Sequence, residues 1–146
     1  LLLTTSQIQL VGARLGAIHD IVPAHRFETD PGPDTEIDPL RTALATLLTG
    51  VDEYADLADP VTSPEPASGS LSNDLAIIAG ALTHGLAHHE AGRPTEALWW
   101  WQYSYLADWG DRAAMAVRVL QTMLAHLRLD ADPDIVGEAE FDALHR

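Results

Sequence analysis

The sequence predicts an all-α fold: a single-domain, up-down helical bundle of about five helices, built around an aromatic-rich central helix. Three observations predict it. Apolar residues recur three and four positions apart along most of the chain. Helix start and stop signals separate these periodic segments. No segment shows a convincing alternation of apolar and polar residues, which a half-buried strand would require.

The first helix is expected to begin at Ser6, a good N-cap, and to end at Pro23. Its apolar face carries Ile8, Val11, Leu15, Ile18 and Val22. Gly12 and Gly16 have no side chain, so they would let another helix approach this one closely.

A loop is expected over residues 23–36, because it contains a Pro-Gly-Pro breaker. Asp38 and Pro39 then mark a helix start, which we expect to continue to Ala58. The next segment, 59–70, contains three prolines and is predicted to be an extended linker.

A third helix is predicted from Ser70 or Ser72 to Gly92, and Pro94 opens a fourth that stops near Gly110. A fifth follows over residues 111–128. The short links between these helices predict an antiparallel, up-down arrangement.

The helical domain is therefore expected to cover residues 1–128. The acidic tail 129–146 has room for one short helix containing Phe141 and Leu144.

The charge balance excludes several partners. The 146 residues include 22 acidic and 8 basic side chains, which gives a net charge of −14. Phosphate backbones and anionic membranes repel such a chain, so neither nucleic acid nor a membrane is an expected partner. No apolar run approaches the ~20 residues that span a bilayer. Together with the absence of cysteine, this predicts a cytoplasmic protein.

Six of the nine aromatic residues (from four Trp, three Tyr and two Phe) lie within residues 99–110. At 100° per residue, Trp101, Tyr105 and Trp109 share one helix face. Large rings at this spacing favour a central, buried helix. The alternative is an aromatic pocket or contact surface that stacks on a sugar, a base or a quaternary ammonium. Its candidate residues are Trp99, Trp100, Tyr103 and Ser104.

His84 and His88 form an HxxxH pair, a spacing that zinc sites often use. The helical angles predict that both face solvent or another subunit, whereas His89 lies on the buried edge. A third ligand, such as His126, would be needed for a metal site. Two histidines alone lack that ligand count, so a structural role is the favoured interpretation.

Arg14 and His19 resemble the arginine and histidine pair of HEPN-like helical nucleases, in which the histidine assists transfer. Leu15 stands where those enzymes place a polar residue, and the net charge of −14 opposes RNA binding. Ser72 and Ser104 have no arranged base, so the sequence does not support nucleophilic catalysis.

Three motifs carry a family resemblance: GSLSNDLA (69–76), EAGRPTEA (90–97) and W-x-W-x-Y-S-Y-x-x-x-W-G (99–110). With them, residues 69–127 resemble the bacterial family called domain of unknown function 5063. The resemblance implies a small all-α domain with no assigned activity and no assigned catalytic residues. It also implies changes at five positions where the family places an acid, an arginine, an acid and two histidines. Here these positions are Ile77, Gln102, Leu106, Asp108 and Arg112.

The leading hypothesis is a non-catalytic interaction or accessory domain that binds a protein partner or a second copy of itself, without a cofactor. The alternative is a metal-dependent or HEPN-like helical enzyme that uses the histidines above.

Overall fold

The computed structural model describes residues 1–59 and 61–129. It is mostly helical, as predicted, and adds one small antiparallel sheet. In chain order the elements are α1 (Leu2–Ala17), α2 (Asp38–Leu47), β1 (Glu53–Asp59), β2 (Ser63–Ser70), α3 (Leu71–Glu90), α4 (Pro94–Ser104), the π-helical segment η1 (Tyr105–Trp109) and α5 (Gly110–Leu129). The predicted short helix in the tail lies outside the described residues. Each described helix is too short or too polar to span a bilayer.

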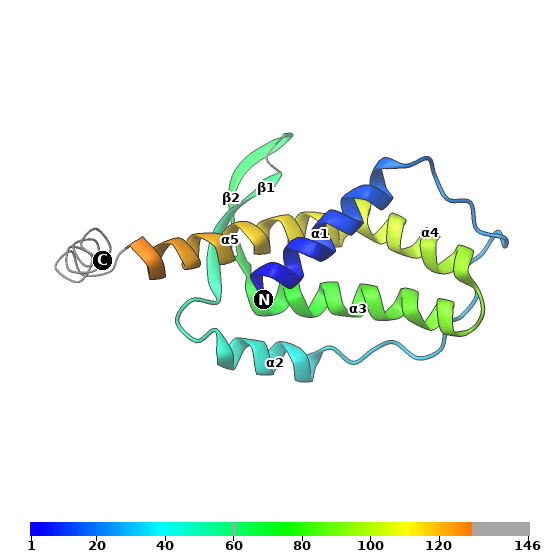
Figure 1. Cartoon of the computed structure of the whole chain (residues 1–146), viewed down its shortest axis with the longest axis horizontal. Coiled ribbons are helices and arrows are strands. Elements are labelled where there is room, and N and C mark those ends of the chain that lie inside the picture. Colours follow the sequence, from blue (N-terminus) through cyan, green and yellow to red (C-terminus); the bar gives the residue numbers. More distant parts are fainter. Residues whose placement is uncertain (60, 130–146) are drawn as a thin grey trace, which may run out of the picture.

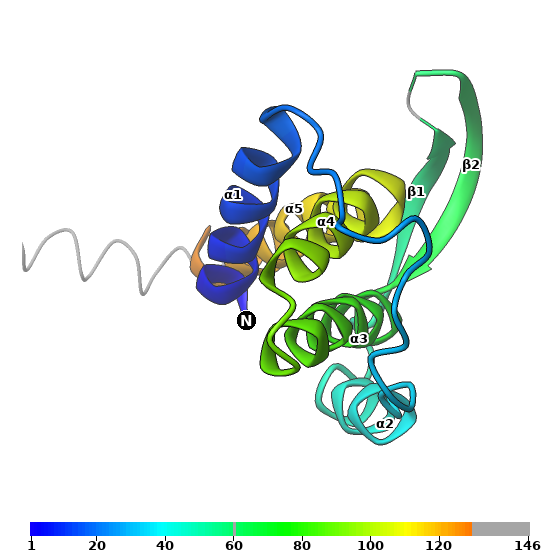
Figure 2. The ribbon, with the colours of Figure 1, turned by 90° about the vertical axis from the view of Figure 1, so that its right-hand side faces the viewer.

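The helices lie side by side around the long rod formed by α4, η1 and α5 (Figures 1 and 2). α1 packs on one side of this rod and α3 on the other, while α2 packs on α3. The β1–β2 hairpin projects away from the helices (Figure 1). A long loop from α1 to α2 crosses α4 and thereby carries distant residues to the end of α3 (Figure 2).

The expected antiparallel turn between the fourth and fifth helices is wrong. The backbone stays helical through Ser104 and Gly110, and the Gly110 N–H donates to the Tyr105 carbonyl, five residues earlier. That bond widens the helix into a π turn without reversing it. Glycine suits this position because a Cβ there would lie 2.5 Å from the Tyr105 carbonyl oxygen. The fold is consequently not a five-helix up-down bundle.

The prediction of a helix to Ala58 followed by a linker is also wrong. α2 ends at Leu47, and Gly50 then takes a left-handed conformation (φ +86°) that a continuing helix cannot contain. β1 and β2 pair antiparallel, with Tyr54 opposite Gly69 and Leu57 opposite Pro66. The pair forms a two-stranded sheet, so each strand has a free edge that tolerates proline.

The ends of α3 follow the predicted signals. Ser70 is the N-cap and accepts a hydrogen bond from the Asn73 N–H, 3.3 Å away. Gly92, at φ +74°, ends the helix, and Pro94 opens α4. α1, in contrast, begins at Leu2 and ends at Ala17, earlier than predicted at both ends.

The close approach predicted for Gly12 is confirmed. Trp109 is only 2% exposed, and its ring and that of Tyr105 lie directly over Gly12. Tyr105 also covers Gly16. Of the three rings expected at the centre, only Trp109 is fully buried. Trp101 lines a surface groove and Tyr105 packs on α1, and both stay partly exposed.

The buried indole of Trp109 and the partly buried indoles of Trp100 and Trp101 each find the partner that the N–H requires. Trp100 Nε1 donates to the Ala81 carbonyl (2.9 Å) and Trp101 Nε1 to the Leu82 carbonyl (3.1 Å). Trp109 Nε1 donates to Ser104 Oγ (3.0 Å). The aromatic segment therefore fastens the α4–α5 rod to α3 by hydrogen bonds as well as by packing.

Candidate functional site

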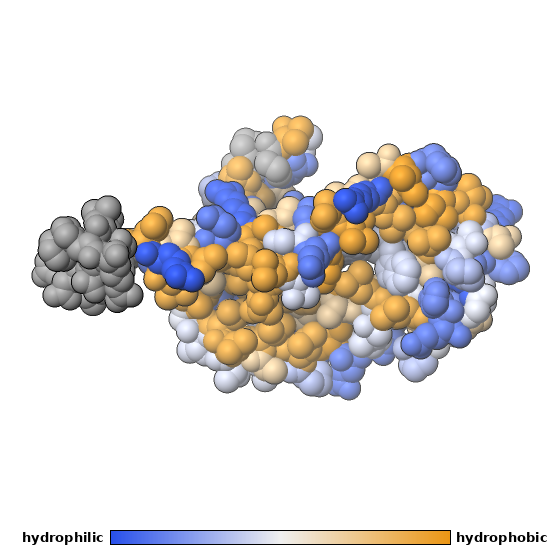
Figure 3. All heavy atoms as spheres, in the orientation of Figure 1, coloured by the Kyte–Doolittle hydropathy of each residue, from blue (hydrophilic) through white to orange (hydrophobic). Residues whose placement is uncertain are grey.

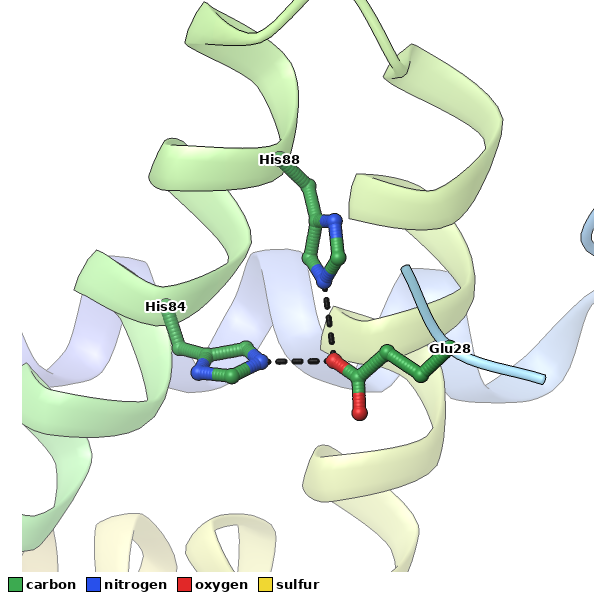
Figure 4. A group of neighbouring side chains, drawn as sticks. All are labelled: Glu28, His84 and His88. Atoms are coloured by element: carbon green, nitrogen blue, oxygen red, sulfur yellow. Dashed lines mark hydrogen bonds and ion pairs between the residues drawn. The ribbon is translucent and has the colours of Figure 1, made fainter. Parts of the chain in front are cut away.

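Two histidines of α3 and one glutamate of the α1–α2 loop converge on a single point (Figure 4). His84 and His88 are four residues apart, so they share one helix face. Their Nε2 atoms lie 2.6 Å and 2.8 Å from the same carboxylate oxygen, Glu28 Oε1. Glu28 precedes them by 56 and 60 residues, so only the tertiary fold brings the three together.

The site is largely covered, which corrects the prediction of a solvent-facing pair. His88 is completely buried, and the side chains of His84 and Glu28 are 21% and 32% exposed. His89, expected on the buried edge, is exposed instead. The helical angles misplaced these residues because α3 is packed against α2 as well as α4, and its Leu86 is 47% exposed.

The loop that carries Glu28 is anchored on both sides of it. Gln102, which is 4% exposed, accepts a hydrogen bond from the Ile21 N–H (2.8 Å). It also donates to the Leu15 and His19 carbonyls. Beyond Glu28, Arg93 donates to the Asp30 carbonyl (3.3 Å). The path of the loop is therefore set by contacts of α4 and of the α3–α4 turn.

Trp100 borders the site. Its ring lies against that of His84, with centroids 4.1 Å apart. A cavity of about 320 Å³ opens beside these two rings and is also lined by Thr35 and Ile37. Trp100 thus limits how His84 can turn and leaves space next to it.

The charge state of Glu28 suits this site. Burial acts to raise its pKa, but hydrogen bonds from His84 and His88 outweigh that effect and leave the pKa below its ordinary value. Glu28 is therefore a carboxylate at neutral pH, with its oxygen available as an acceptor or a metal ligand.

The donor set fits a divalent transition metal. One carboxylate oxygen and two imidazole nitrogens all lie within 4.8 Å of one another. Tetrahedral zinc with bonds of about 2.1 Å needs its ligand atoms roughly 3.3 Å apart. The distances from Glu28 Oε1 to His84 Nε2 and His88 Nε2 would have to grow by roughly 0.7 and 0.5 Å to meet that geometry, and the partly exposed Glu28 side chain leaves room for this. His88 Nδ1 is buried without a hydrogen-bond partner among the described residues.

Stability at acid pH tests whether Glu28 holds the loop in metal-free protein. Its pKa is lowered from 4.5, so its contribution is present above about pH 4.5 and is lost as the pH falls through the lower, folded value. With chelator present, the free energy of unfolding of the wild type should therefore fall more steeply below pH 4.5 than that of Glu28→Gln. Glu36→Gln, an exposed change in the same loop, is the control. Urea titrations from pH 6 to pH 3 measure this, and parallel curves for wild type and Glu28→Gln would contradict it.

Three of the four residues predicted for an aromatic pocket, Trp99, Trp100 and Tyr103, lie as one group of rings with centroids 5.6, 6.3 and 6.4 Å apart. Trp99 and Tyr103 stack on each other and line a cavity, whereas Trp100 faces His84. Ser104 is buried and donates to the Trp100 carbonyl (2.6 Å), so it supports the indoles from inside.

Arg14 and His19 do not share a helix, because α1 ends at Ala17. Both are exposed, and the His19 carbonyl is used by Gln102. The structure therefore does not bring them together on one helix face. His126, proposed as a third ligand, is on α5, and the described metal-ligand group contains Glu28 in its place.

A second polar cluster lies under the hairpin and was not predicted. Asp74 is 3% exposed and accepts hydrogen bonds from Arg112 (2.7 Å) and from the Tyr54 hydroxyl. Arg112 also pairs with Asp108 (2.7 Å). Burial and the Asp74 carboxylate raise the pKa of Tyr54, so its hydroxyl stays a donor. All these groups are paired, which indicates a structural role.

Comparison with protein families identifies the chain. The family model for Domain of unknown function (DUF5063) matches residues 1–126. The chain belongs to this family. The DUF5063 match extends well before the 69–127 segment that carries the sequence motifs, and it includes Glu28, His84 and His88. No curated protein and no solved structure matches this DUF5063 chain.

Proposed function

We propose that this domain binds one divalent transition-metal ion, with zinc the first candidate, through the Glu28 carboxylate and the Nε2 atoms of His84 and His88. The observation that carries the proposal is the convergence of two imidazole nitrogens on one carboxylate oxygen, at 2.6 and 2.8 Å. The proposal replaces the expectation of a domain without a cofactor.

The chemistry of the donors favours a metal over a simple hydrogen-bonded clasp. Imidazole and carboxylate donors suit zinc, iron, nickel and copper, and a set of three leaves one coordination position free for water or a small ligand. The charge also agrees, because a dication neutralises the negative charge of Glu28 in a chain of net charge −14. Such a centre can hold the α1–α2 loop closed or polarise a bound water.

Zinc titration of chelator-treated protein without a histidine tag tests the proposal. We expect one ion per chain, and at least about tenfold weaker binding in Glu28→Gln and His84→Asn, since each removes one of three ligands. His89→Asn changes an exposed histidine one position past His88 and should bind as the wild type does. Binding that is equal in all four proteins, or absent from the wild type, would refute the site.

A second candidate function is the interaction domain predicted from the sequence. α1 exposes Leu3 (80%) and Val11 (62%), and a groove of about 340 Å³ runs beside it to Leu82 and Trp101. Figure 3 shows a broad hydrophobic surface on the face that α1 occupies. These features favour a protein partner or a second copy of the chain. A cytoplasmic location, and the absence of nucleic-acid and membrane partners, stay predictions from composition.

A further inference from the structure

A second pocket, separate from the proposed metal site, lies between α4 and the first part of the α1–α2 loop. Its volume is about 390 Å³. One wall consists of Trp99 and Tyr103, whose rings are nearly parallel (9°) with centroids 5.6 Å apart. Tyr103 is 54% exposed, so its ring is accessible to a ligand.

The part of the pocket lining that comes from the loop is held in place. Residues 20–23 form it, and Gln102 fixes this segment through the Ile21 N–H (2.8 Å) and the His19 carbonyl (3.3 Å). Gln102 is 4% exposed, so these hydrogen bonds are shielded from water. The pocket is therefore formed before any ligand arrives, which lowers the entropy cost of binding.

The charge around the pocket selects a cation. Asp20 contributes an exposed carboxylate, and the pocket lining includes no arginine, lysine or histidine. Aromatic faces attract cations through their quadrupole, and ammonium ligands bind where such faces meet a carboxylate. Phosphorylated ligands are repelled by the same carboxylate.

The one amide side chain in the pocket lining is not available to a sugar. The amide of Gln102 already forms hydrogen bonds with the loop backbone and with the Leu15 carbonyl, so it is not free to bond to sugar hydroxyls. The remaining wall, including Val22 and Leu106, is apolar and suits methyl groups.

We infer that this pocket binds a small organic ammonium ion, best a methylated one, with the cation over Trp99 and Tyr103 and its charge balanced by Asp20. Nothing in this assignment depends on the metal site, so each can fail without the other.

A titration with choline followed by ¹H–¹⁵N NMR tests the inference, with chelator present to remove metal effects. Saturable shifts should concentrate at the Trp99 indole N–H and at the amides of residues 20–23. 3,3-Dimethyl-1-butanol, the uncharged isostere of choline, should bind about tenfold more weakly, since cation–π and charge terms are lost. Equal binding of the two would show an apolar pocket and overturn the inference, as would the absence of saturable shifts with choline.

Single-residue variants test which side chains contact choline. Tyr103→Leu removes the accessible ring and Asp20→Asn the charge, and each should weaken choline binding by about three- to tenfold. Tyr103→Phe keeps the ring and should bind nearly as the wild type does, and Glu36→Gln controls for the loss of one carboxylate in the same loop. All are changes at exposed positions, so the NMR spectra of the free variants should confirm that they fold. Binding by Asp20→Asn and Tyr103→Leu at wild-type strength would place the ligand elsewhere.

Discussion

Gly85→Ala should lower the free energy of unfolding by about 1–3 kcal/mol, the usual cost of overpacking a filled core site. The Trp101 indole lies directly on Gly85, and a Cβ there would fall far inside van der Waals distance of Trp101 Nε1. The ring cannot withdraw freely, because that nitrogen donates to the Leu82 carbonyl (3.1 Å). Alanine gains up to about 1 kcal/mol of helix propensity over glycine, which the clash outweighs.

Gly80→Ala is the matched control on the same helix. Its Cβ would meet only the Ile37 Cγ2 methyl, at 3.0 Å, so a shift of a few tenths of an ångström relieves the contact. Because alanine gains helix propensity over glycine, the free energy of unfolding of Gly80→Ala should be at most about 0.5 kcal/mol below that of the wild type, or higher than it. Urea unfolding followed by circular dichroism measures both. Equal effects of the two substitutions would show that Trp101 does not pack on Gly85.

Asp74→Ala should cost about 2–4 kcal/mol, because it removes the buried partner of two groups at once. Arg112 would lose a hydrogen bond of 2.7 Å, and the half-buried Tyr54 hydroxyl would lose its acceptor. This carboxylate links Tyr54 of β1 to Arg112 of α5, beside the apolar packing of the same elements, so its loss should also loosen β1 against the helices.

Asp108→Ala provides the comparison. Asp108 contacts the same guanidinium at 2.7 Å, but its side chain is 48% exposed. An exposed pair contributes about 0–1 kcal/mol, so this change should cost far less than Asp74→Ala. Thermal unfolding of both variants measures the two losses of stability. Losses of similar size would mean that burial of Asp74 contributes nothing beyond a surface ion pair.

Local signals in the sequence determine much of the fold. The ends of α3 and the start of α4 are predicted correctly from Ser70, Gly92 and Pro94, because capping and left-handed turns depend on a few neighbouring residues. Gly12 was predicted as a point of close approach, and Trp109 lies there. The partners of the Trp100 and Trp101 indoles belong to a different helix pair, α3 with α4, in which α3 supplies the carbonyls of Ala81 and Leu82.

The errors arise where tertiary contacts override local signals. Gly110 resembles a helix terminator, but the packing of Tyr105 and Trp109 on α1 favours a π turn that keeps the helix going. The hairpin is missed because Pro66 and its neighbours resemble a linker, while the pairing of Tyr54 with Gly69 is a contact over 15 positions that no local pattern shows.

The candidate site likewise contains residues that a local pattern indicates and one that only tertiary contacts position. His84 and His88 are visible in the sequence because four-residue spacing on a helix joins them. Glu28 is not, since a single glutamate in a loop carries no periodic signal and its position depends on Gln102 and Arg93. The predicted solvent exposure of the histidines was wrong because it depends on the packing of α3 against α2 and α4 and on the loop that carries Glu28, and no local pattern gives either.

The most direct test of the metal proposal is a crystal structure of the zinc-loaded protein with data collected at the zinc absorption edge. We predict one anomalous peak per chain, about 2.0–2.2 Å from His84 Nε2, His88 Nε2 and a Glu28 oxygen. A peak bound by other residues, or a zinc-soaked crystal in which Glu28 still hydrogen-bonds both imidazoles with no peak between them, would contradict it.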